Sequence, residues 1–199
     1  TDHDGTINLG AVVRVVPIKD ILTLLRAFFL VHRDMPNTHL YIMGNMEENP
    51  EYVETCKRMT QLLHLEKAVD FTGTVKVTDY LPKMDLTILS SISEGQPLSV
   101  LESFAAHRPA VTTDVGCCQE LIYGDSQDKL GTAGAVVPPL DFGSMAREIL
   151  RLIRDFKLRF QMAEVGYERT KRQYTYEQFI NSYRTIYLQA GKEKREWLA

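Results

Sequence analysis

Short apolar runs that alternate with longer amphipathic stretches are the feature that most restricts the fold of this chain. The runs are apolar almost throughout, which is typical of strands buried on both faces of a parallel sheet. The stretches between them have the apolar spacing of helices packed on such a sheet. We expect strands at 7–13, 39–43, 68–72, 86–90, 110–113 and 134–137. The pattern predicts an α/β fold, with a doubly wound parallel sheet covered by helices on both faces.

The remainder of the sequence, from residue 141 onward, has only helical spacing. A first apolar stripe consists of Met145, Ile149, Ile153 and Phe156. The segment TYEQ, 175–178, has the pattern of a capping box and opens a final helix at 174–190. A second stripe on that helix consists of Phe179, Tyr183, Ile186 and Tyr187. We expect this second stripe to be buried in the core or in an interface.

The composition is that of an ordinary globular domain. The chain has 199 residues, 44% of them hydrophobic and 25% charged, which is enough for one sizeable core. We expect a single domain over 1–199, with a short tail at 1–6 and a charged tail at 191–199. The D-x-D motif of Asp2–Asp4 could bind a metal, but it precedes the first expected strand and is interpreted as part of the tail.

Charge and cysteine content exclude several classes of function. A net charge of -3 provides no basic field, so we expect no nucleic-acid partner. The three cysteines contain no C-x-x-C pair, so neither a disulfide framework nor a zinc site is expected. No apolar run reaches the roughly 18 residues of a membrane helix, and the first residues do not resemble a signal peptide. We therefore expect no transmembrane segment and a cytoplasmic location.

Four loops mark the expected binding edge of the sheet. Ligands of open α/β sheets bind where the loops at the carboxyl ends of the strands converge. The loops that follow the first four strands are RVVPIKD, GNMEENP, GTVKV and SISEGQP. The first contains no glycine and so lacks the G-x-G-x-x-G pattern of a dinucleotide-dependent dehydrogenase.

The first loop has two cations that suit a phosphate group. Arg14 and Lys19 flank a proline turn, and Asp20 can cap the helix that follows. In the fourth loop, Pro97 and Leu98 suit the first two positions of another helix, whose free backbone N–H groups would face the same crevice. These features favour a phosphate or diphosphate site. The alternative is that both cations are solvated surface charges.

Two glutamates, Glu94 and Glu102, lie in and just after the fourth loop. A carboxylate can accept hydrogen bonds from two neighbouring hydroxyl groups. Together with the cations, the two carboxylates indicate a ligand with diols on each side of a diphosphate, which is a nucleotide sugar. The alternatives are an ordinary loop acid for Glu94 and a favourable charge near a helix N-terminus for Glu102.

Three segments, taken in order, resemble a known family. They are RVVPIK (14–19), the E-x7-E of SEGQPLSVLE (93–102) and TDVGCCQEL (113–121). This set, over about 12–155, is similar to the donor-binding half of retaining GT-B glycosyltransferases of family 4. Within the family, the residues of these segments are most similar to the Pel exopolysaccharide glucosyltransferase type. The resemblance implies a Rossmann-like fold, the C-terminal half of a GT-B enzyme.

The resemblance also implies roles for individual residues. Arg14 and Lys19 would neutralise the donor diphosphate, Glu94 would hold sugar hydroxyls, and Glu102 would bind the ribose. The donor-binding positions that it implies are Thr74, Val75, Gly95, Gln96, Pro97, Leu98, Ser99 and Glu102, with Thr74 and Val75 near the base. No metal and no further cofactor would be required. Pro97 departs from the family pattern and removes one backbone N–H donor.

The resemblance finally implies a partner and a reaction. The acceptor-binding half of a GT-B enzyme is normally N-terminal and is not in this sequence, so we expect the chain to be a donor domain that transfers little by itself. The expected donor is UDP-glucose, in retaining transfer for polysaccharide or glycoconjugate biosynthesis, and a membrane-associated complex is among the implied partners. Two alternatives stay open. They are a non-catalytic nucleotide-sugar sensor or interaction module, and a sugar-nucleotide epimerase on the same scaffold.

Overall fold

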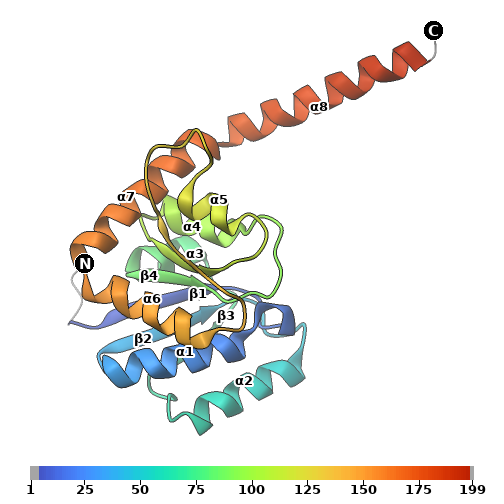
Figure 1. Ribbon diagram of the computed structural model, residues 1–199. Coiled ribbons are helices and arrows are strands. Elements are labelled where there is room, and N and C mark those ends of the chain that lie inside the picture. Colours follow the sequence, from blue (N-terminus) through green and yellow to red (C-terminus); the bar gives the residue numbers. More distant parts are fainter. Residues whose placement is uncertain (1–4, 198–199) are drawn as a thin grey trace.

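The chain forms one six-stranded parallel sheet with helices packed against it, as the sequence predicted (Figure 1). The computed structural model describes residues 5–197. The strand order is β3-β2-β1-β4-β5-β6. The strands are β1 (Ile7–Val12), β2 (Thr38–Met43), β3 (Val69–Gly73), β4 (Leu86–Leu89), β5 (Ala110–Thr113) and β6 (Gly134–Val137). The expected strand bounds are confirmed to within one residue.

The strand order places a switch point between β1 and β4. From β1 the chain winds outward through β2 to β3, and it then returns to place β4 on the other side of β1. Leu9 of β1 pairs with Leu86 of β4, and Gly10 pairs with Thr87. Loops leaving β1 and β4 therefore diverge to opposite sides, which opens a crevice at the carboxyl ends of these two strands.

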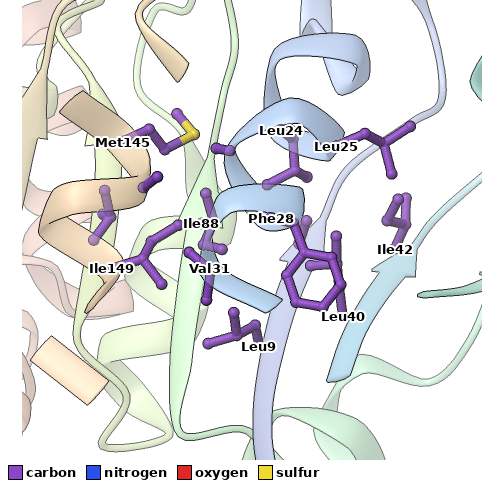
Figure 2. Close-up of a cluster of buried hydrophobic side chains, with 14 of the residues drawn as sticks. Leu9, Leu24, Leu25, Phe28, Val31, Leu40, Ile42, Ile88, Met145 and Ile149 are labelled. Atoms are coloured by element: carbon purple, nitrogen blue, oxygen red, sulfur yellow. The ribbon is translucent and has the colours of Figure 1, made fainter. Parts of the chain in front are cut away.

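Helices cover both faces of the sheet. They are α1 (Ile21–Asp34), α2 (Pro50–Leu62), α3 (Val77–Tyr80), α4 (Leu98–Ala105), α5 (Cys118–Tyr123), α6 (Phe142–Arg154), α7 (Phe156–Gln173) and α8 (Tyr176–Trp197), with short 3-10 turns η1 (Pro17–Lys19) and η2 (Leu81–Lys83). Figure 2 shows Phe28 of α1 and Ile149 of α6 in one buried cluster with Ile88 of β4. The next strand residue, Leu89, belongs to a second cluster with Phe104 of α4. Successive strand residues point to opposite faces, so each face has its own helical layer.

The first apolar stripe is shorter than predicted. Met145, Ile149 and Ile153 are buried on α6, but Phe156 is 70% exposed. Helix α6 ends at Arg154. The side chain of the next residue, Asp155, accepts a hydrogen bond from the backbone N–H of Leu158 at 2.9 Å and so caps the next helix, α7. The prediction for Phe156 was wrong because this cap interrupts the helical register.

The capping box before the last helix is confirmed. The Thr175 N–H donates to Gln178 Oε1 at 3.0 Å, and the Gln178 N–H donates to Thr175 Oγ1 at 3.3 Å. Helix α8 continues to Trp197, past residue 190 where a charged tail was expected, and it projects away from the sheet (Figure 1). Its predicted stripe is exposed and not in a core, at Phe179, Tyr183, Ile186 and Tyr187. Asp2–Asp4 lie outside the described residues. Within residues 5–197, no helix has an apolar stretch long enough to cross a bilayer.

A buried arginine fastens α7 to the loop after α5. The side chains of Arg169 and Asp128 are both 0% exposed, and Arg169 Nε donates to Asp128 Oδ2 at 2.6 Å. Arg169 Nη1 donates to the carbonyl oxygens of Leu121 and Ile122, each at 2.9 Å, and Nη2 donates to that of Gly131. The hydrogen bond from Arg169 holds the pKa of Asp128 below its usual range.

Candidate functional site

A cleft with a volume of about 350 Å³ lies at the carboxyl ends of β1, β2 and β4. It is the crevice at the switch point between β1 and β4, where such folds bind ligands. The predicted site residues that line it are Arg14, Lys19, Thr74, Val75, Glu94, Gln96, Pro97, Leu98 and Ser99. Side chains that the sequence did not single out complete the wall, among them Met43 and Val77.

Hydrogen bonds join the loops around this cleft. The backbone N–H of Val15 donates to the carbonyl of Asn45 at 2.9 Å, which ties the first loop to the second. The Gly44 N–H donates to the Gly73 carbonyl at 2.9 Å and ties the second loop to the third. Ser90 Oγ donates to the Lys19 carbonyl at 2.8 Å, which ties the fourth loop to the first. The cleft therefore has a wall of interlinked backbone.

Lys19 and Glu94 form an ion pair inside the cleft. Lys19 Nζ lies 2.5 Å from Glu94 Oε1, and Ser91 Oγ donates to the same oxygen at 2.6 Å. The two charged side chains are only 16% and 12% exposed. Asp20 has φ 46° and accepts from the Thr23 N–H at 3.3 Å, so it caps α1 as predicted and turns the chain directly after Lys19. The pair and its Ser91 contact could not be read from the sequence.

Arg14 has an acidic partner as well. Its Nη1 donates to Glu48 Oε1 at 2.7 Å and to Glu48 Oε2 at 2.6 Å. This pair is far more exposed than the first, with side-chain exposures of 53% for Arg14 and 48% for Glu48. Glu48 does not itself line the cleft, and the sequence did not single it out, although its loop, GNMEENP, was among the four expected at this edge.

Helix α4 points its N-terminus at the cleft. The helix begins at Leu98, and Pro97 is its N-cap with φ -75° and ψ 105°, so the prediction of Pro97 as the first helical residue was wrong by one position. The first N–H groups of a helix have no acceptor within it, so those of Leu98 and Ser99 are available to an anion. Glu102 is exposed and does not line the cleft, but it follows Leu98 by one helical turn and shares its face of α4.

Gly116 supports the loop that contains Glu94. Its φ is +53°, and a Cβ at this position would collide with the carbonyl oxygen of Gly95. The Gly95 carbonyl also accepts a hydrogen bond from the Cys117 N–H at 3.0 Å, so Gly95 faces this loop and does not line the cleft. Burial raises the pKa of the Cys118 thiol to about 11, and burial and Glu120 raise that of Cys117. Neither thiol is a ready nucleophile at neutral pH.

The site is therefore a cleft with two cations, each paired with a carboxylate, a helix N-terminus and an apolar wall. In the part of the chain that the structure describes, no three His, Cys, Asp or Glu side chains gather as a metal site would require. The guanidinium group of Arg14, the ammonium group of Lys19 and free backbone amides can bind a phosphate or diphosphate. The carboxylate of Glu94, held beside Lys19, can accept hydrogen bonds from ligand hydroxyl groups.

Known proteins are similar in sequence to this chain over most of its length. The family model described as Glycosyl transferases group 1 matches residues 6–155. The chain is 32% identical over 161 residues to an exopolysaccharide phosphotransferase of Streptomyces coelicolor, a match that covers 80% of this chain and 16% of that protein. It is 28% identical over 172 residues to the N-acetyl-alpha-D-glucosaminyl L-malate synthase of Bacillus anthracis, over 85% of this chain and 42% of that one. The chain thus spans less than half the length of either relative.

Solved structures share the fold. HepE of Anabaena in complex with UDP-glucose superposes with a TM-score of 0.82 at 19% identity, over 94% of this chain and 49% of that one. The C-terminal domain of LpcC, a group 1 glycosyl transferase from Francisella tularensis, gives a TM-score of 0.75 at 21% identity, over 85% of this chain and 87% of that one. These likenesses identify the sheet as that of GT-B glycosyltransferases. The family model matches well over half of the sequence, and the chain belongs to the glycosyl transferases group 1 family.

Proposed function

We propose that this chain is the donor-binding half of a retaining glycosyltransferase that uses a nucleotide-diphosphate sugar in polysaccharide or glycoconjugate biosynthesis. UDP-glucose is the proposed donor, from the similarity to the Pel type and because HepE was solved with that ligand. The observation that supports the proposal most directly is the meeting of Arg14, Lys19 and the N-terminus of α4 in one cleft. Such a site suits a diphosphate.

The proposed chemistry follows from where charge develops. Departure of a nucleoside diphosphate from the sugar builds negative charge on its terminal phosphate. Fixed cations and helix amides stabilise that charge most effectively when they are already in place before the reaction. Arg14, Lys19 and the N–H groups of Leu98 and Ser99 would have this role, and no metal ion or further cofactor would be required.

The two ends of the donor would be held by different loops. Glu94 would accept hydrogen bonds from the sugar hydroxyls, while Ser91 keeps its carboxylate in place. Glu102, one turn along α4, would bind the ribose, and the base would lie near Thr74 and Val75. The carboxylate of Glu94 is close enough to Lys19 for the sugar and the diphosphate to be bound side by side.

Transfer to an acceptor would require a second domain. This chain spans 49% of the HepE chain, so we propose that an acceptor-binding half completes the enzyme. The exposed stripe of α8, with Phe179 and Tyr183 about half exposed, offers an apolar surface for such a contact. The chain alone is then expected to bind the donor and to transfer little.

Calorimetric titration with UDP, GDP, UDP-glucose and GDP-mannose tests the proposal. We expect saturable binding of the uridine compounds and a Kd for UDP that rises roughly tenfold to 100-fold in Lys19→Met, because a charged hydrogen bond to phosphate is lost. Lys76→Met is the matched control, since Lys76 is 77% exposed in the third loop and pairs with Asp79. The proposal is wrong if none of the four compounds binds at millimolar concentration, or if both variants lose affinity equally.

A further inference from the structure

Glu48 is hydrogen-bonded to the side chain of Arg14, one of the two cations that we propose bind the diphosphate. Both of its carboxylate oxygens accept from Arg14 Nη1, at 2.7 and 2.6 Å. The loop around it is fixed on both sides. Asn45 Oδ1 accepts from the Glu47 N–H at 2.6 Å, and Asn49 Oδ1 accepts from the Tyr52 N–H at 3.0 Å. Glu48 is thus presented to Arg14 by a short, tethered segment.

The ion pairs of Lys19 with Glu94 and of Arg14 with Glu48 differ in how easily a ligand can open them. The side chains of Lys19 and Glu94 are 16% and 12% exposed, whereas those of Arg14 and Glu48 are 53% and 48% exposed. A carboxylate that leaves an exposed pair is rehydrated at once, so such pairs contribute little and exchange readily. A diphosphate has more negative charge than one carboxylate and forms stronger hydrogen bonds with a guanidinium group.

We infer that Glu48 is an internal anion that competes with the donor diphosphate for Arg14 and thereby sets the affinity of the cleft. Donor binding would break the Arg14–Glu48 pair and leave the Lys19–Glu94 pair beside the sugar. The inference rests on the proposed function and goes further, because it assigns a regulating role to a residue outside the predicted binding set. Its consequence is that the native sequence binds nucleotide more weakly than the same cleft without this carboxylate.

The test compares Glu48→Gln with Glu47→Gln by calorimetric titration with UDP and with uridine at low ionic strength. Both variants remove one negative charge from adjacent exposed positions of one loop, but only Glu48 contacts Arg14. We expect the Kd for UDP to fall roughly threefold to fivefold in Glu48→Gln. It should change much less in Glu47→Gln, and the gain should shrink as salt is added. Uridine, which has no phosphate, should bind all three proteins equally.

A second pair of variants locates the effect. In an Arg14→Gln background, Glu48→Gln should give no gain in affinity for UDP, because the guanidinium group for which Glu48 and the phosphate compete is absent. The inference is wrong if wild type binds UDP and Glu48→Gln binds it no better, if Glu47→Gln gains as much, or if the gain extends to uridine. Failure of wild type and Glu48→Gln alike to bind UDP at millimolar concentration would instead refute the proposed function, and the inference with it.

Discussion

Replacing Arg169 with methionine is expected to lower the free energy of unfolding by roughly 3–5 kcal/mol, the usual result of breaking a buried ion pair from one side. The side chains of Arg169 and Asp128 are both 0% exposed, so the remaining carboxylate cannot be rehydrated without local rearrangement. Three backbone carbonyls, of Leu121, Ile122 and Gly131, lose their donor as well. Each bond lost in this way adds to the expected cost.

Urea unfolding followed by circular dichroism at 222 nm measures this effect, and thermal unfolding gives a second estimate. For a domain of this size the expected loss lowers Tm by roughly 6–20 °C. The control is Arg172→Met, one turn further along α7, because Arg172 is 60% exposed in its pair with Glu168 and should contribute at most about 1 kcal/mol. If Arg169→Met does not fold, Asp128→Asn gives a milder test, with an expected loss of roughly 1–3 kcal/mol. A loss in Arg169→Met no larger than in Arg172→Met would refute the reasoning.

Further predictions concern Gly116, Asp128 and the buried cysteines. Gly116→Ala should lower the free energy of unfolding by about 2 kcal/mol or more, since φ is +53° and the added Cβ meets backbone atoms. Gly95→Ala should lower it much less, because a Cβ there has nothing within 4 Å. Equal urea midpoints for the two variants would contradict this prediction. The pKa of Asp128 is lowered in the folded protein, so the ionised carboxylate stabilises the fold fully above about pH 4, and this stabilisation is lost as pH falls through the folded-state pKa. Wild type should therefore lose more free energy of unfolding than Asp128→Asn when the pH is lowered from 5 to 2 in urea titrations. Burial raises the pKa of the Cys118 thiol to about 11 and that of Cys56 to about 12, so neither should react with iodoacetamide in native protein at pH 7.5. Rapid alkylation of either cysteine, detected by mass spectrometry, would contradict the structure.

The sheet was predictable because buried parallel strands have a local signature. The run 86–90 is mostly apolar and contains no charged residue, and β4 is fully buried at Leu86–Leu89. Phe156 shows the limit of such periodicity. Its spacing continued the stripe of α6, but the polar cap at Asp155 determined where the helix ended. A single capping carboxylate outweighs an apolar period because a helix end leaves several N–H groups without acceptors.

The candidate site was predictable as a set of loops, but its internal pairing was not. The rule that ligands bind at the carboxyl ends of strands brought Arg14, Lys19 and Glu94 to one edge, and all three line the cleft. The rule says nothing about which carboxylate would lie against which cation. Glu48 and Lys19 could each have paired otherwise, since that choice depends on loop geometry across residues far apart in the sequence. Arg169 gave no signal at all, because an arginine on a helix is normally exposed.

The switch point between β1 and β4 also orders events during folding. Strands β1 to β3 and strands β4 to β6 can each pair through crossovers between consecutive strands, whereas pairing of Leu9 with Leu86 closes a loop that contains half of the sheet. Closing so long a loop is slow relative to local pairing. Lys19 and Glu94, 75 positions apart, approach each other only when this seam closes. With the nucleotide binding proposed above, binding during refolding would therefore report the joining of the two half-sheets, and neither half formed on its own would give that signal.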